Sequence, residues 1–192
     1  MEKIKVFEKE INYIKKVEYR ENTKKLLEML PDYFYEIPAS STGKYHPSYA
    51  LGAGGLVRHT KAAVKIAYSL LDNNTIGSAF KDDEKDLIII SLLIHDGLKS
   101  GLNHEKYTRF DHPLLIADFV RKNKDKLTFK NDEIEFICSN VETHMGQWNI
   151  DYNGKEVLPL PKNKYQKFVH MCDFLASRKF LEVPFKNNDI DE

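Results

Sequence analysis

The segment DLIIISLLIHD, residues 86–96, decides the fold of this chain. Its central run, 87–94, is apolar on nearly every side of a helix, and a helix of that kind is buried. The run is far shorter than the roughly 20 residues that cross a bilayer. It therefore predicts the central helix of a globular core, with Asp82 and Asp83 capping its start and its end near Gly97.

Apolar residues spaced three and four apart predict further helices on both sides of this segment. The ranges expected to be helical are 6–30 (one or two helices, ended by Pro31), 54–71, 113–122, 132–143 and 164–180. Ordered loops are expected between them, and the polar tail after Val183 is expected to fray. Strand signals are few, although residues 152–158 could form a short hairpin. The pattern predicts one all-α domain, a helical bundle without internal repeats.

Composition limits the classes of function. The 192 residues carry 29 Lys and Arg against 29 Asp and Glu, so no broad basic surface for nucleic acid or membrane is expected, although a local basic groove is possible. Cys138 and Cys172 stand in no metal-binding spacing and cannot make a disulfide scaffold. The N-terminus has no apolar signal segment. We expect a cytoplasmic protein with no membrane association.

The dipeptide His95-Asp96 follows the central apolar helix directly. A buried carboxylate is costly unless it is paired or bound to a metal. Taken alone, the dipeptide equally permits a purely structural role, in which backbone amides or a surface cation satisfy Asp96 and His95 caps carbonyl groups.

Other helices also deliver a histidine or aspartate at an inward or terminal position. These residues are His59, His112, His144, His170 and Asp173. Each alone is more often a core or cap residue than a ligand. In a bundle such residues converge, and helical bundles commonly build metal sites in this way.

The first candidate ligand set is His59, His95, Asp96 and Asp173. Two imidazoles and two carboxylates without a thiolate argue against structural zinc and favour Mn, Fe, Co, Ni or Mg. Such an ion activates water and polarises a phosphoryl oxygen, so the set predicts hydrolytic chemistry without a protein nucleophile. His170 is expected to support Asp173 from beside it.

The ordered pattern H…HD…H…H…D resembles that of the HD-domain superfamily of metal-dependent phosphohydrolases, over residues 46–178. The matching pieces are GGLVRHT (54–60), LLIHDGLKSG (92–101), DHPLLIADF (111–119), THMGQW (143–148) and HMCDFLASR (170–178). The chain most resembles the HD module of 3′→5′ exoribonuclease-type proteins. Their histidine and aromatic residue before GGLxxHT are matched here by His46 and Tyr49.

The resemblance implies an HD-type bundle, with residues 1–50 as N-terminal helices and a loop leading into a metal-binding core at 51–182. It makes His59, His95, Asp96 and Asp173 the metal ligands. Lys99 matches a lysine that could contact the scissile phosphate. His112 and His144 match positions that hold a second ion or contact phosphate.

Other candidates for phosphate contact are His46, Arg58 and Arg109, each with a solvated or structural role as the alternative. Gln147 and Trp148 could border a base or sugar pocket, or Trp148 could simply be an exposed loop residue.

Two features depart from the family pattern. Many two-metal relatives have His-His where this chain has His144-Met145, which favours one ion or a weak second site. The exoribonucleases also carry a nucleic-acid-binding domain for which this chain has no room, so nucleic acid is not the favoured substrate.

We therefore expect a metal-dependent phosphohydrolase acting on a phosphomonoester or phosphodiester of a nucleotide, with Asp96, Lys99, His112 and His144 in catalysis. The alternatives are a nucleotide-sensing module with little or no turnover and a small 3′→5′ nuclease. The N-terminal helices could cap the domain or pair two copies into a homodimer.

Overall fold

A computed structural model describes residues 3–40, 42–44 and 46–191. Its α-helices are α1 (Glu8–Ile11), α2 (Val17–Met29), α3 (Gly55–Asp72), α4 (Asn74–Gly77), α5 (Asp82–Ile94), α6 (His112–Lys122), α7 (Asn131–Glu142) and α8 (Lys164–Ala176). Short 3₁₀ turns lie at Lys5–Phe7, Asp32–Tyr35, Ser48–Ala50 and Lys124–Lys126. One two-residue hairpin, β1 (Phe185–Lys186) with β2 (Asp189–Ile190), is the only sheet in the described ranges. The expected all-α fold is confirmed.

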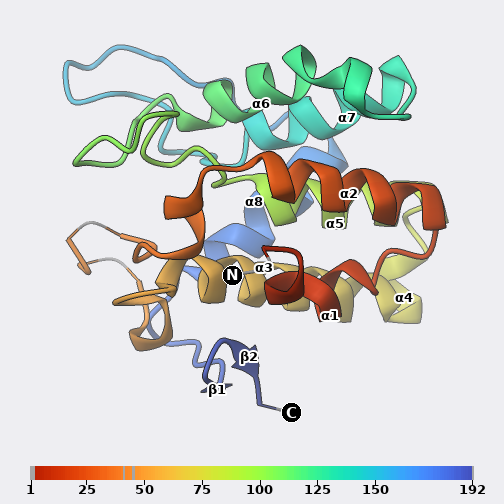
Figure 1. The fold of residues 1–192 in the computed structure, drawn as a ribbon, viewed down its shortest axis with the longest axis horizontal. Coiled ribbons are helices and arrows are strands. Elements are labelled where there is room, and N and C mark those ends of the chain that lie inside the picture. The colour runs from red at the N-terminus through yellow and green to blue at the C-terminus, as the bar shows by residue number, and fades with distance from the viewer. Residues whose placement is uncertain (1–2, 41, 45, 192) are drawn as a thin grey trace.

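Helix α5 is the centre of the bundle, and every residue of its apolar run is buried (Figure 1). It packs against α2, α3, α7 and α8. Its first residue is Asp82, so Asp82 and Asp83 lie in the first turn and do not cap it as expected. Instead, the Lys81 backbone N–H donates to Glu84 Oε2 at 2.8 Å. The helix ends at Ile94, immediately before His95-Asp96.

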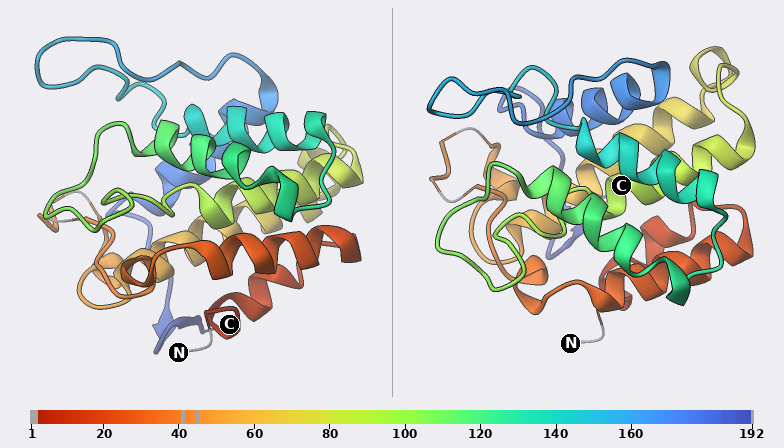
Figure 2. Two further views of the ribbon diagram at one scale, coloured as in Figure 1. Left: turned by 45° about the horizontal axis from the view of Figure 1, so that its top comes forward. Right: turned by 90° about the horizontal axis from the view of Figure 1, so that it is seen from above.

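The long loops gather at one end of the bundle. The segments 31–40, 46–54 and 95–111 and the first part of 143–163 lie on the left in Figure 1 and again in the left panel of Figure 2, whereas the end of the last segment crosses to the start of α8. Helices α6 and α7 pack together on one side of α5, while α3 and α8 pack on another. The C-terminal end of α5 therefore opens into the loop-rich end.

Two contacts fix the segment around His95-Asp96 to the N-terminal part of the chain. The Tyr33 hydroxyl donates to the Gly101 carbonyl at 2.6 Å and accepts the Ser100 N–H at 3.2 Å. Gly97 lies so close to α2 that a Cβ there would be 2.8 Å from Leu30 Cδ2. A side chain at Gly97 would push the turn away from Leu30, so this glycine is a packing requirement.

The expectation of a frayed tail after Val183 is wrong. Lys61 is buried in α3, and its ammonium lies 2.5 Å from Asp189 Oδ1 in β2 and 3.7 Å from Glu10 Oε2 in α1. The Phe185 ring also packs on Tyr49, with centroids 5.2 Å apart. The hairpin is held by residues far away in sequence, which local composition does not reveal.

Two smaller features also differ from expectation. The last long helix ends at Ala176, short of residue 180. The suggested hairpin at 152–158 is reduced to one isolated bridge between Ile150 and Glu156. No helix in the described ranges has both the length and the apolar character that a bilayer span requires.

Candidate metal centre

Six of the histidines and aspartates singled out in the sequence converge at the loop-rich end of α5. His59 comes from α3, His95 and Asp96 follow α5, His112 opens α6, His144 follows α7, and Asp173 comes from α8. All are buried except Asp173, whose side chain retains 16% exposure. The spatial convergence expected from the helix positions is therefore present.

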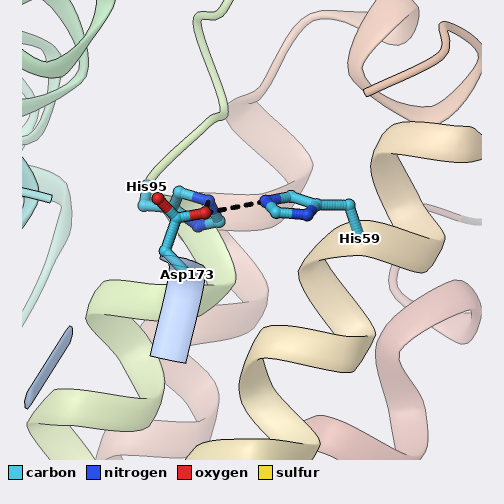
Figure 3. A group of neighbouring side chains, drawn as sticks. All are labelled: His59, His95 and Asp173. Carbon is cyan, nitrogen blue, oxygen red and sulfur yellow. Dashed lines mark hydrogen bonds and ion pairs between the residues drawn. The ribbon is translucent and has the colours of Figure 1, made fainter. Parts of the chain in front are cut away.

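The first group of donor atoms is built on His59, His95 and Asp173, whose ligand atoms all lie within 4.8 Å of one another (Figure 3). His59 Nε2 lies 2.9 Å from Asp173 Oδ1 and 3.8 Å from Asp96 Oδ2. His95 Nε2 lies 3.4 Å from Asp173 Oδ1 and 3.5 Å from Asp96 Oδ2. Ligand atoms placed about 2.1 Å from one ion are about 3.0–3.4 Å apart in octahedral or tetrahedral arrangements. His59, His95 and Asp173 are spaced to hold one divalent ion, and Asp96 Oδ2 lies 3.5–3.8 Å from the two imidazole nitrogens.

A second group uses the other oxygen of Asp96. Asp96 Oδ1 lies 3.0 Å from His112 Nε2 and 3.7 Å from His144 Nε2. The two imidazole nitrogens are 3.2 Å apart. Asp96 thus presents one carboxylate oxygen to each group, which is the position of a bridging ligand.

The ring nitrogens that point away from the centre fix the tautomers. Nδ1 of each of three histidines lies 2.7 Å from the carbonyl oxygen three residues earlier; the pairs are His95 with Leu92, His112 with Arg109, and His144 with Val141. A carbonyl only accepts, so each Nδ1 carries a hydrogen, and in a neutral ring Nε2 presents its lone pair to the centre. This arrangement is typical of metal-binding histidines.

The consequence is an excess of acceptor atoms in a buried space. His112 and His144 direct lone pairs at each other, and neither His95 Nε2 nor Asp96 Oδ1 has a hydrogen-bond partner among the described residues. The lone pairs of His112 and His144 and the unpaired oxygen of Asp96 repel one another unless a cation or a proton lies between them. The donor set therefore fits a bound metal better than it fits a network of internal hydrogen bonds.

The chain itself supplies two positive charges to this centre. The Lys99 ammonium contacts Asp96 Oδ2. Burial lowers the pKa of His95, but Asp96 and Asp173 outweigh burial and raise this pKa to about 10. Although burial raises the pKa of each carboxyl, Lys99 and His95 hold that of Asp96 well below its usual range, and His59 and His95 do the same for Asp173.

His46 lies beside the centre, as its place in the sequence suggested. Its ring meets that of His59 edge-on, with centroids 5.1 Å apart, and its buried Nδ1 has no hydrogen-bond partner in the described part of the chain. Burial and the neighbouring His59 lower the pKa of His46 to about 3. A neutral ring at this position can contact a ligand without adding charge.

Arg58 does not serve the centre as expected. Its guanidinium donates to the carbonyls of Tyr49 and Leu51, among others, and to Asn188 Oδ1. These bonds hold the loop before α3 and the C-terminal segment together. The expected phosphate contact is corrected to a structural role, because the hydrogen-bonding edges of the guanidinium are committed to these acceptors.

Arg109 is likewise neutralised within its own loop. Nε and Nη2 donate to the two carboxylate oxygens of Asp111, each at 2.8 Å, and Nη1 donates to Glu105 at 2.6 Å. Two carboxylates already balance this cation, so the structure does not support the expected phosphate contact.

His170 supports the second group of donors instead of Asp173. Its Nδ1 donates to the backbone carbonyl of His144 at 2.7 Å. Sequence reasoning gave no role to Phe174 and Arg178, although an aromatic residue beside Asp173 and an arginine just after the end of α8 were a usable signal.

Comparisons of the chain with protein-family models, curated proteins and solved structures return no match. The HD-type assignment therefore stays a prediction.

Proposed function

We propose that this protein is an HD-type, metal-dependent phosphohydrolase that cleaves a phosphomonoester or phosphodiester of a nucleotide. One observation carries the proposal: Asp96 presents its two oxygens to two groups of histidine lone pairs in a buried space. Two adjacent cation positions that share a carboxylate are the usual arrangement for phosphoryl chemistry.

His59, His95, Asp96 and Asp173 would hold the first ion, and Asp96, His112 and His144 a second. A divalent ion held there polarises a phosphoryl oxygen and lowers the pKa of a nearby water. Nitrogen and oxygen donors without thiolate suit Mn, Fe, Co, Ni or Mg. The second position has three protein donors, whereas the first has four, and Met145 adds no imidazole to it. We therefore expect the second ion to bind more weakly than the first.

Lys99 and His46 are the residues placed to meet the phosphate. Lys99 lies at the edge of the centre and keeps a little exposure, so its ammonium can leave Asp96 when another cation neutralises that carboxylate. It then offers positive charge to a phosphate oxygen. His46 is neutral and can donate or accept one hydrogen bond.

Metal analysis of the purified protein, combined with a phosphate-release screen, tests this function. The screen uses phosphomonoesters and phosphodiesters with protein stripped by a chelator and then supplied with Mn, Fe, Co, Ni or Mg. We expect bound metal as purified, and activity that the chelator removes and one of these ions restores. Activity that persists in fully stripped protein would contradict the proposal.

The contact between Lys99 and Asp96 favours one competing function, a nucleotide-sensing module without turnover, because the lysine occupies an oxygen that a catalytic ion needs. Such a module predicts that nucleotides raise the melting temperature while no tested metal supports phosphate release. A nuclease would instead show binding to single-stranded nucleic acid that weakens steeply with salt.

A further inference from the structure

A stacked group of side chains, here called the platform, lies beside the metal centre and consists of Trp148, Phe174 and Arg178. The Trp148 and Phe174 rings stack with centroids 5.8 Å apart and an angle of 19°. The Arg178 guanidinium carbon lies 4.3 Å from the Phe174 centroid and 5.6 Å from that of Trp148. The rings are therefore held in place before any ligand binds.

His170 connects the platform to the centre. Its ring lies edge-on to Trp148, with centroids 6.3 Å apart, and its Nδ1 donates to the carbonyl of His144. Gly146 makes this approach possible: its φ is +58°, and a Cβ there would be 2.2 Å from His170 Cε1. His170 thus contacts both Trp148 of the platform and the backbone of His144, a member of the second donor group.

The platform is open and carries an unbalanced charge. Trp148 remains 41% exposed although one face is stacked. Arg178 donates to Ser177 Oγ and to the Phe174 carbonyl, but within the described ranges no carboxylate pairs with it. Arg58 and Arg109 are committed to other acceptors, so Arg178 is the arginine near this centre that can meet an anionic ligand.

We propose that the platform stacks the base of a nucleotide whose phosphate reaches the metal centre, so that Trp148 and Phe174 select nucleotides over other phosphate esters. This inference rests on the proposed function. A flat aromatic base gains from stacking on such rings and from the adjacent cation, whereas a sugar phosphate without a base has no flat ring to stack.

Trp148 is the only tryptophan of the chain, so its fluorescence reports on the platform directly. The purified protein with Mg is mixed in a stopped-flow instrument with adenosine 5′-monophosphate, its 3′ isomer, ribose 5-phosphate or inorganic phosphate. We expect saturable quenching by at least one adenosine monophosphate and none by the other two compounds. Absent quenching, or equal quenching by ribose 5-phosphate, would overturn the platform whatever the phosphate-release assay shows.

Variants then test the stacking itself. Phe174→Ala should weaken adenosine monophosphate binding by roughly 5- to 150-fold, the range for one lost base stack. Arg178→Gln, a milder change outside the helix, should weaken it less and provides the test if Phe174→Ala does not fold. The matched control is Tyr152→Ala in the same loop, because Tyr152 is 94% exposed and lies outside the platform. Unchanged affinity in Arg178→Gln and in a folded Phe174→Ala would overturn the proposal.

Activity separates the two proposals. If ribose 5-phosphate and adenosine monophosphate are hydrolysed with equal kcat/KM, the platform has no role in specificity and only the phosphohydrolase stands. If adenosine monophosphate quenches Trp148 but no metal supports phosphate release, the platform stands and the phosphohydrolase fails. A Trp148→Ala variant that loses activity on nucleotides but keeps it on ribose 5-phosphate supports both.

Discussion

Asp86 lies near the start of α5 and Asp96 lies just after its end, and the two carboxylates have different hydrogen-bond partners. Both carboxylates are buried. Asp86 accepts the backbone N–H groups of Lys15 and Lys16, one on each oxygen and each at 2.9 Å. Asp96 instead faces imidazole lone pairs, and its Oδ1 has no hydrogen-bond partner in the described part of the chain.

The pKa directions follow the same division. Burial raises the pKa of Asp86 despite its two backbone donors. Burial also acts on Asp96, but there Lys99 and His95 prevail and hold its pKa well below the usual range. A buried carboxylate alone is thus no sign of a site. The sign is a buried carboxylate that keeps one oxygen without a hydrogen-bond donor while several imidazoles gather around it.

Replacing Asp96 should have the largest effect. Asp96→Asn removes the ligand shared by both donor groups, so metal content should fall to near zero. Phosphate release should fall by at least about 100-fold, since even a residue that only orients a metal ligand is worth about 10- to 100-fold. Elemental analysis and the phosphate assay measure both, with Asp86→Asn as the matched control. Equal metal content in the two variants would contradict the assignment of Asp96, and not Asp86, as a metal ligand.

The second largest effect is expected from pH, which should change the affinity for metal. The pKa of His95 is about 10 in the metal-free fold, against 6.5 for an ordinary histidine side chain, so a proton must leave Nε2 before an ion binds. Affinity should therefore rise with pH, by about tenfold per unit for each proton released. The same shift stabilises the metal-free fold below pH 6.5, and that contribution is lost as pH rises through about 10.

Calorimetry of metal binding in buffers of different ionisation enthalpy, between about pH 6 and 8, counts the released protons. Binding that releases none over this interval would show that His95 is not protonated in the metal-free centre.

Asp86→Asn should reverse the pattern of Asp96→Asn. An amide offers only one acceptor oxygen, so one of the N–H groups of Lys15 and Lys16 loses its partner where the chain turns into α2. A buried unsatisfied group costs about 1–3 kcal/mol. Urea denaturation should show that loss, with metal content unchanged. A metal deficit in this variant would mean that the two ends of the helix are not independent.

The smallest effect is expected at Lys61, a buried cation whose charge is balanced by Glu10 and Asp189. Asp189→Asn removes one partner of Lys61, but Asp189 is 73% exposed and Glu10 remains nearby. Thermal melts should show a loss below about 1 kcal/mol. A larger loss would show that the C-terminal hairpin holds α3 in place more firmly than its exposure indicates.

Much of the helical frame was predictable because its causes are local. The apolar run before His95 can only be buried, and the inward position of His59 follows from its spacing to Leu56 and Ala63. Convergence around one point was predictable because a bundle leaves few other places for these residues.

The remaining features depend on partners that residue type does not reveal. Arg58 bonds mainly to backbone carbonyls of an irregular loop, and His170 to the carbonyl of His144. The hairpin that holds Asp189 meets Lys61 across 128 positions of the chain. Such contacts are set by the path of the backbone, which no local pattern of side chains encodes.

The pairing of Lys99 with Asp96 separates the folding of the chain from its activation by metal. Protonated His95 and Lys99 together match the charge of Asp96 and Asp173, so the chain can complete its fold with a counter-ion of its own. Under the proposed function, a shortage of metal would lower turnover without lowering the amount of folded protein. The amount of folded protein would then depend on its synthesis, whereas its turnover would depend on the concentration of available metal ions.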